Sequence, residues 1–98
     1  INNDLIKSIK NKNFYTYGQK DNSNFLIKNI KQYKLYSEFD LKINLPNKAI
    51  YNIQKFRIPL LGIHNIRNSV AAIAVSLTIG ISVSKVKEGL IDFKGVQN

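Results

Sequence analysis

The spacing of apolar residues changes near residue 62, and this change limits what the chain can fold into. Between residues 35 and 60, apolar and polar side chains alternate in runs separated by turn residues. From residue 66 onward the apolar residues recur at helical spacing, at Ile66, Val70, Ala71, Ile73, Ala74 and Leu77. Alternation is typical of a strand with one buried face, whereas recurrence every third or fourth residue is typical of an amphipathic helix. The sequence therefore predicts an α/β fold.

The part of the chain before this change predicts an antiparallel β-meander over residues 24–61. Its apolar runs cover residues 25–30, 35–44 and 50–60. In the middle run, the side chains expected on the buried face are Leu35, Phe39, Leu41 and Ile43. Glu38 and Asp40 share the opposite face, where an exposed polar surface is favoured over a paired acid site. A small meander cannot close a core by itself, so it must pack against another element.

Two helices are predicted in residues 62–96, after the meander. Gly80 follows the last apolar residue of the first helix, which is the usual place of a C-terminal glycine. Ser82 or Ser84 then caps the second helix. The apolar positions of the second helix are Val83, Val86, Leu90 and Ile91. Ahead of the meander, residues 1–18 predict a helix followed by a short strand, which together form half of an α/β repeat.

The composition excludes several kinds of function. The chain has no cysteine, so it has neither a disulfide framework nor a thiolate nucleophile. Its five glycines do not have the spacing of a phosphate-binding loop, G-x-x-x-x-G-K-[ST]. No apolar run approaches the roughly 20 residues that a membrane span needs. We therefore expect no catalytic triad, no metal cluster, no triphosphate-binding loop and no membrane segment in this stretch.

The net charge of +9 raises the question of nucleic-acid binding. The charge comes from 13 lysines and only 2 arginines, and the lysines are spread along the chain. Proteins that read bases and phosphates usually cluster arginine, whose planar group binds in a bidentate way. The pattern therefore favours a solvated surface, and a small basic nucleic-acid-binding module is the alternative. That alternative predicts a steep salt dependence of binding.

Asn65 and Asn68, with His64 just before them, form the candidate binding group of the chain. The two asparagines lie three residues apart, on one face of the first helical turn. A side-chain amide presents a donor beside an acceptor, which matches the N6/N7 edge of adenine, and the His64 ring could stack on a base or a ribose. In the alternative, His64 or Asn65 is a simple N-cap and Asn68 is solvated. The residues alone leave both interpretations open.

The motifs around these residues resemble those of a known family. The sequence reads Gly62-x-His64-Asn65-x-x-Asn68-x-x-Ala71-Ala72, then Gly80-Ile81-Ser82, then Leu90-x-x-Phe93-x-Gly95-Val96. In this order the motifs resemble the Mur ligases of peptidoglycan synthesis. The last motif resembles most closely the member that joins L-alanine to UDP-N-acetylmuramate, and a Mur-type ligase with another amino-acid acceptor is the alternative. The likeness covers the whole chain in order, although only residues 62–96 are specific.

The resemblance implies that residues 1–98 are the C-terminal part of the central ATP-binding domain. In the family this domain has three layers, α/β/α, with a mostly parallel sheet and a small antiparallel sheet at its side. Residues 62–96 would be two helices that lead to an interdomain linker. By position, His64, Asn65 and Asn68 match the family's adenine-binding residues.

The resemblance also implies where the other functional parts lie. ATP would be bound jointly with a phosphate loop and Mg²⁺ ligands upstream of this stretch, so we expect no catalytic or metal-binding residue here. The enzyme would be cytoplasmic and bacterial, with UDP-N-acetylmuramate and L-alanine as substrates. The stretch alone would be inactive, would bind neither a membrane nor a specific nucleic acid, and would self-associate through apolar faces that its own residues do not cover.

Overall fold

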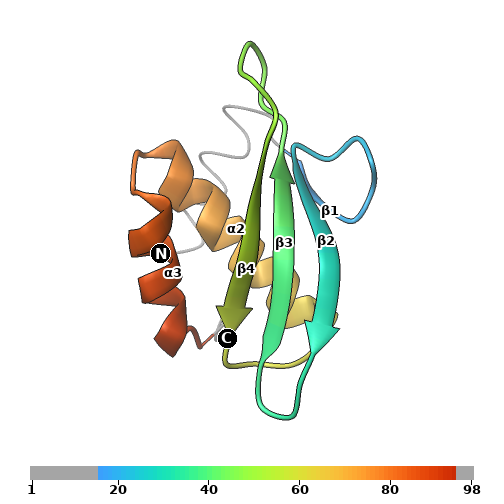
Figure 1. Cartoon of the computed structure of the whole chain (residues 1–98), viewed down its shortest axis with the longest axis vertical. Helices are drawn as coiled ribbons and strands as arrows, with labels where there is room; N and C mark the ends of the chain where they lie inside the picture. The colour runs from blue at the N-terminus through green and yellow to red at the C-terminus, as the bar shows by residue number, and fades with distance from the viewer. Residues whose placement is uncertain (1–15, 95–98) are drawn as a thin grey trace.

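The computed structural model of the chain describes residues 16–94 (Figure 1). Four strands and two helices follow one another, with a short 3₁₀ turn at the end. The strands are β1 (Tyr17–Gly18), β2 (Phe25–Gln32), β3 (Ser37–Ile43) and β4 (Tyr51–Ile58). The helical elements are α2 (Ile63–Thr78), α3 (Val83–Gly89) and η1 (Leu90–Asp92). The predicted α/β class is confirmed, while most of the predicted helix–strand unit over residues 1–18 lies outside the described residues.

The strands form one mixed sheet in the order β1-β2-β3-β4. β2, β3 and β4 pair antiparallel, so the predicted meander is confirmed. Within residues 16–94 only β1 and β2 pair in parallel. Two adjacent parallel strands usually need a long crossover connection. Here residues 19–24 join β1 to β2, and Asn24 holds this short loop in place. Its Oδ1 accepts from the Thr16 backbone N–H at 2.9 Å, and its Nδ2 donates to the Asn44 carbonyl at 2.7 Å.

The core lies between the meander and α2, which crosses behind the sheet in Figure 1. Phe39, Leu41 and Ile43 of β3 are fully buried. Ile66, Val70 and Ile73 bring the apolar stripe of α2 to the same cluster. Burial of large apolar side chains is the main favourable term in folding. The predicted spacing of both elements therefore identifies the side chains that build the core.

Two apolar residues do not lie where their patterns predict. Leu35 was expected on the buried face, but it is 77% exposed because β3 begins only at Ser37 and Leu35 lies in the β2–β3 turn. Ile91 was expected on the apolar face of the second helix, but it is 67% exposed because α3 ends at Gly89 and the chain tightens into η1. Both residues lie just outside a regular element that is shorter than the apolar pattern predicts.

The predicted C-terminal end of the first helix and the predicted serine cap of the second are confirmed. Gly80 has φ 94° and follows α2, and its N–H donates to the Leu77 carbonyl at 3.1 Å while the Ile81 N–H donates to the Ser76 carbonyl at 3.0 Å. This pair of bonds is the Schellman motif, which satisfies the last carbonyls of a helix. Ser82 is the N-cap of α3, and its side chain accepts from the Lys85 N–H.

Candidate functional site

His64, Asn65 and Asn68 lie in the first two turns of α2, which begins at Ile63. The N-cap is Gly62, with φ 98° and ψ 144°, and no side chain caps the helix end. The interpretation of His64 or Asn65 as the N-cap is therefore wrong, because the helix begins one residue before His64. Both residues lie within the helix, and neither side chain caps it.

The two asparagines use their amide nitrogens within the chain. Asn65 Nδ2 donates to the Leu61 carbonyl at 2.9 Å, and Asn68 Nδ2 lies 3.3 Å from His64 Nε2. The second contact joins residues one helical turn apart and brings His64 and Asn68 together on one face. Among residues 16–94, no hydrogen bond reaches the amide oxygen of either asparagine. These oxygens are therefore available as acceptors for a ligand's N–H groups.

The backbone at the start of α2 adds donors to this group. The first hydrogen bond of the helix runs from the Ile66 N–H to the Gly62 carbonyl, at 3.1 Å. The N–H groups of residues 63–65 come before it, and the first turn has no acidic residue. Such N–H groups carry the positive end of the helix dipole. The end of α2 thus combines amide acceptors with donors that lack a partner within the helix.

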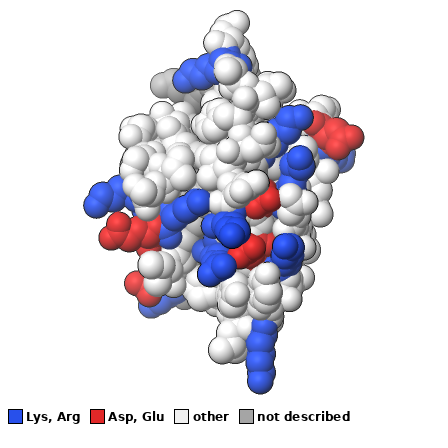
Figure 2. Space-filling model, in the orientation of Figure 1, with Lys and Arg blue, Asp and Glu red and all other residues white. Residues whose placement is uncertain are grey.

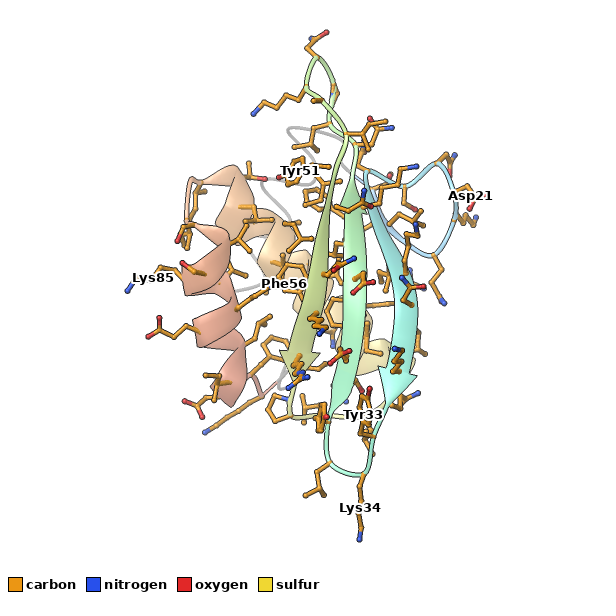
Figure 3. The ribbon with its side chains drawn as sticks, viewed as in Figure 1. Asp21, Tyr33, Lys34, Tyr51, Phe56 and Lys85 are labelled. Atoms are coloured by element: carbon orange, nitrogen blue, oxygen red, sulfur yellow. The ribbon has the colours of Figure 1, made fainter. Side chains whose placement is uncertain are left out.

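Side chains from the sheet hold the connection between β4 and α2, and the sequence alone did not identify them. Ser37 Oγ donates to the Leu60 carbonyl at 2.7 Å, and Gln32 Oε1 accepts from the Gly62 N–H at 2.8 Å. Ser37 is fully buried on the apolar face of β3. The alternating sequence pattern places residue 37 on that face, but it does not indicate what the hydroxyl group binds. These bonds bring the β2–β3 turn, where Figure 3 labels Tyr33, close to the start of α2.

The outer face of the sheet is exposed, as the meander pattern predicts, and Figure 2 shows acidic side chains among its basic ones. Glu38 accepts from Arg57 Nε at 2.7 Å, and this hydrogen bond raises the pKa of the Arg57 guanidinium. Asp40 binds Asn29 and the Lys55 backbone instead. The two acids therefore have separate partners and do not form a paired acid site. Glu38 is also more buried than predicted, with 8% of its surface exposed.

A groove of about 370 Å³ lies between β4 and the α3–η1 segment. Its walls include Tyr36, Arg57 and Lys87. None of the three predicted site residues lines it. Arg57 is paired with Glu38, and Lys87 Nζ donates to the Gln54 carbonyl at 2.6 Å. Two of its cations are therefore already engaged within the chain.

The described residues contain neither a metal-binding cluster nor a membrane-spanning helix. Between residues 16 and 94, no three His, Cys, Asp or Glu side chains are grouped so that they could hold a metal ion. In the same part of the chain, no helix combines the length and the apolar character needed to span a bilayer. Within the same residues, the hydrogen-bonding group at the start of α2 is the candidate site.

The family model of the Mur ligase middle domain matches residues 1–76. The chain belongs to the Mur ligase family. The match ends within α2, so it includes the meander and all three candidate residues.

Named Mur ligases share sequence with nearly the whole chain. The UDP-N-acetylmuramate–L-alanine ligase of Pelagibacter ubique is 62% identical over 96 residues, which is 98% of this chain and 21% of that protein. The ligase of the same name from Rickettsia bellii is 38% identical over 96 residues, or 96% of this chain and 20% of that protein. The chain thus spans about a fifth of the length of these relatives.

A solved Mur ligase structure shares the fold. MurF from Acinetobacter baumannii superposes with a TM-score of 0.60 over 84% of this chain and 16% of that chain. The sequence identity is 22%, so this likeness concerns the fold alone. The two chains therefore share a fold over most of the length of this chain.

Proposed function

We propose that this chain supplies the adenine-binding end of the ATP site in an enzyme that joins L-alanine to UDP-N-acetylmuramate. One observation carries the proposal: Asn65 and Asn68 lie at the uncapped start of α2 with amide oxygens that no described residue binds. The similarity to UDP-N-acetylmuramate–L-alanine ligases supports the choice of reaction. In this proposal residues 1–98 are the C-terminal part of the central domain, and residues 62–96 lead toward its linker.

The hydrogen-bonding groups at the start of α2 fit adenine. Adenine offers an N6 amino donor beside ring-nitrogen acceptors. Asn65 Nδ2 is already bound to the Leu61 carbonyl, so Asn65 presents Oδ1, the atom that an amino group would need. The exposed His64 ring, held by its contact with Asn68, offers a flat surface against which a base could stack. We assign these three side chains to nucleotide binding and none of them to the chemical step.

The reaction would run in two steps. The muramate carboxylate attacks the γ-phosphorus of ATP, which releases ADP and leaves an acyl phosphate. The amine of L-alanine then attacks the acyl carbon, so that an amide forms and inorganic phosphate leaves. Binding ATP at its adenine end fixes the nucleotide in position, which lowers the entropic part of the barrier for the first step.

Magnesium would serve the phosphate end of the same nucleotide. When bound, Mg²⁺ neutralises charge on the phosphates. The described residues contain no cluster of ligands for it, so in this proposal the metal and the phosphate loop are held by other parts of a longer ligase. The 98-residue chain alone is then inactive, and the complete enzyme acts in the cytoplasm, where its nucleotide substrates are found.

A substrate panel tests this proposal. Release of phosphate from ATP by the full-length ligase is measured with UDP-N-acetylmuramate and each of several amino acids. We expect turnover with L-alanine and none without the sugar nucleotide. Turnover with a different amino acid only would favour another Mur-type ligase. Failure of every combination, together with RNA binding that falls steeply with salt, would favour the nucleic-acid-binding alternative.

A further inference from the structure

We propose that Gln32 is a positioning residue for the adenine-binding side chains of α2, and that it acts through the backbone of Gly62. The inference rests on the proposed function. Gln32 is the last residue of β2, and its Oε1 accepts the Gly62 N–H at 2.8 Å across a sequence separation of 30 residues. The bond thus joins the end of the sheet to the residue from which α2 departs.

Gly62 sets the direction in which α2 leaves the sheet. Its φ of 98° and ψ of 144° lie in a region that residues with a side chain rarely adopt. A Cβ added to Gly62 would meet no atom within 4 Å, so the backbone conformation rather than lack of space calls for glycine. The Gly62 N–H precedes the helix and has no helical acceptor. Gln32 supplies that acceptor and holds the unusual conformation in place.

The two residues before Gly62 are also fixed by side chains. Ser37 Oγ donates to the Leu60 carbonyl at 2.7 Å, and Asn65 Nδ2 donates to the Leu61 carbonyl at 2.9 Å. Gln32 and Ser37 are direct cross-strand partners in β2 and β3. Three consecutive linker residues are therefore bound, and the central one is bound by a proposed adenine-binding residue. A shift of this linker would move the group that orients the Asn65 amide.

Gln32 is suited to a positioning role because its side chain adds little to the core. It is exposed, whereas Ser37, on the same linker, is fully buried. Loss of a single exposed hydrogen bond affects folding only slightly. The same bond decides where the start of α2 lies, so nucleotide binding is expected to respond more than stability does. This difference separates positioning from a merely structural role.

Two substitutions in the full-length ligase test the inference. Gln32→Met keeps the length of the side chain and removes the acceptor, whereas Gln32→Glu keeps an acceptor at the same place. We expect Gln32→Met to weaken ATP binding by about three- to tenfold, as for one lost hydrogen bond, and Gln32→Glu to stay within about twofold of the original. Inorganic tripolyphosphate, which lacks adenine, is expected to inhibit all three proteins equally. The KM for ATP is expected to change more than kcat does.

Several results would overturn the inference. Equal ATP affinity in all three proteins would show that the bond to Gly62 does not position the site. Equal losses in both variants would show that the acceptor is not the cause, and a parallel loss of tripolyphosphate inhibition would indicate general damage. Asn65→Ala, measured alongside, identifies which proposal fails. If Asn65→Ala weakens ATP binding and Gln32→Met does not, only the role of Gln32 is wrong, whereas no effect in either contradicts the adenine site itself.

Discussion

Asn29 donates a hydrogen bond of 2.7 Å from Nδ2 to Oδ2 of Asp40, across the outer face of the sheet. The other carboxylate oxygen of Asp40 accepts the Lys55 backbone N–H at 2.9 Å. Asn29 and Lys55 both have positive φ, 54° and 62°, and each lies where the pairing with β3 shifts register. One carboxylate in the central strand therefore stabilises a bulge in each of its neighbours.

Removing this carboxylate is expected to destabilise the sheet. We expect Asp40→Ala to lower the free energy of unfolding by about 1–3 kcal/mol, because two donors held in unusual backbone conformations lose their acceptor. Lys42→Ala, two residues along the same face of β3, is the control and is expected to change stability by less than about 0.5 kcal/mol. Urea denaturation of the chain measures both. Equal effects of the two substitutions would contradict the role given to Asp40.

The contribution of Asp40 is expected to depend on pH. The hydrogen bond from Asn29, above all, lowers the pKa of the Asp40 carboxyl, with help from the Lys55 N–H and nearby lysines, while partial burial opposes the shift. A carboxyl with a lowered folded-state pKa stabilises the fold at pH values above its unfolded pKa of about 3.9. That stabilisation is lost as the pH falls through the folded-state pKa. The stability difference between the original chain and Asp40→Asn should thus be constant from about pH 7 to 5 and shrink below about pH 4. A stability difference that grows as the pH falls would contradict a lowered pKa for Asp40 in the folded chain.

Two glycines form a matched pair for a test of backbone conformation. Gly80 has φ 94°, whereas Gly89 has φ −66° and ψ −23°, and a Cβ would meet no atom within 4 Å at either position. Gly80→Ala is therefore expected to destabilise by about 1 kcal/mol, and Gly89→Ala to stabilise by about 0.4–1 kcal/mol. Thermal unfolding of both variants gives the comparison. A stabilising Gly80→Ala would contradict the Schellman end of α2.

Exposed apolar side chains lead us to predict that the 98-residue chain self-associates. Among residues 16–94, large hydrophobic residues with at least 40% of their surface exposed include Leu35, Ile50, Leu61, Ile63, Ile79, Ile81 and Ile91. Exposed apolar surface promotes association when it gathers in patches. Sedimentation velocity over a range of concentrations should show a sedimentation coefficient that rises with concentration. A constant monomer value would argue against this expectation.

The meander and helices could be predicted because their patterns are local. The buried positions of β3 alternate, and the apolar residues of α2 recur along one face, so each run of residues indicates its own structure. The bulges at Asn29 and Lys55 could not be predicted in this way, because a bulge exists only relative to a partner strand and depends on the position of Asp40. The parallel pairing of β1 likewise depends on contacts made by Asn24 with both Thr16 and Asn44.

The geometry of the candidate site was predictable in part, for the same reason. Asn65 and Asn68 share a helical face by spacing alone, and the adenine-binding role that we propose for this face comes from its resemblance to the family motif. The N-cap itself is Gly62, which neither interpretation of the sequence named, and its N–H donates to Gln32, 30 positions away in the sequence. The sequence contains Gln32 and Ser37 without any sign that both reach the same linker. The features of the site that the sequence pattern did not predict therefore depend on contacts between residues that are distant in the sequence.

The most direct test of the central claim is the ATP affinity of the full-length ligase with its site asparagines removed. Calorimetry would compare Asn65→Ala and Asn68→Ala with Asn52→Ala, an exposed asparagine of β4 that serves as the control. We predict that each site variant loses about 1–3 kcal/mol of ATP binding free energy, as expected for the loss of ligand hydrogen bonds, and that the control loses none. ATP affinity unchanged in both site variants would contradict the assignment of this helix end to adenine.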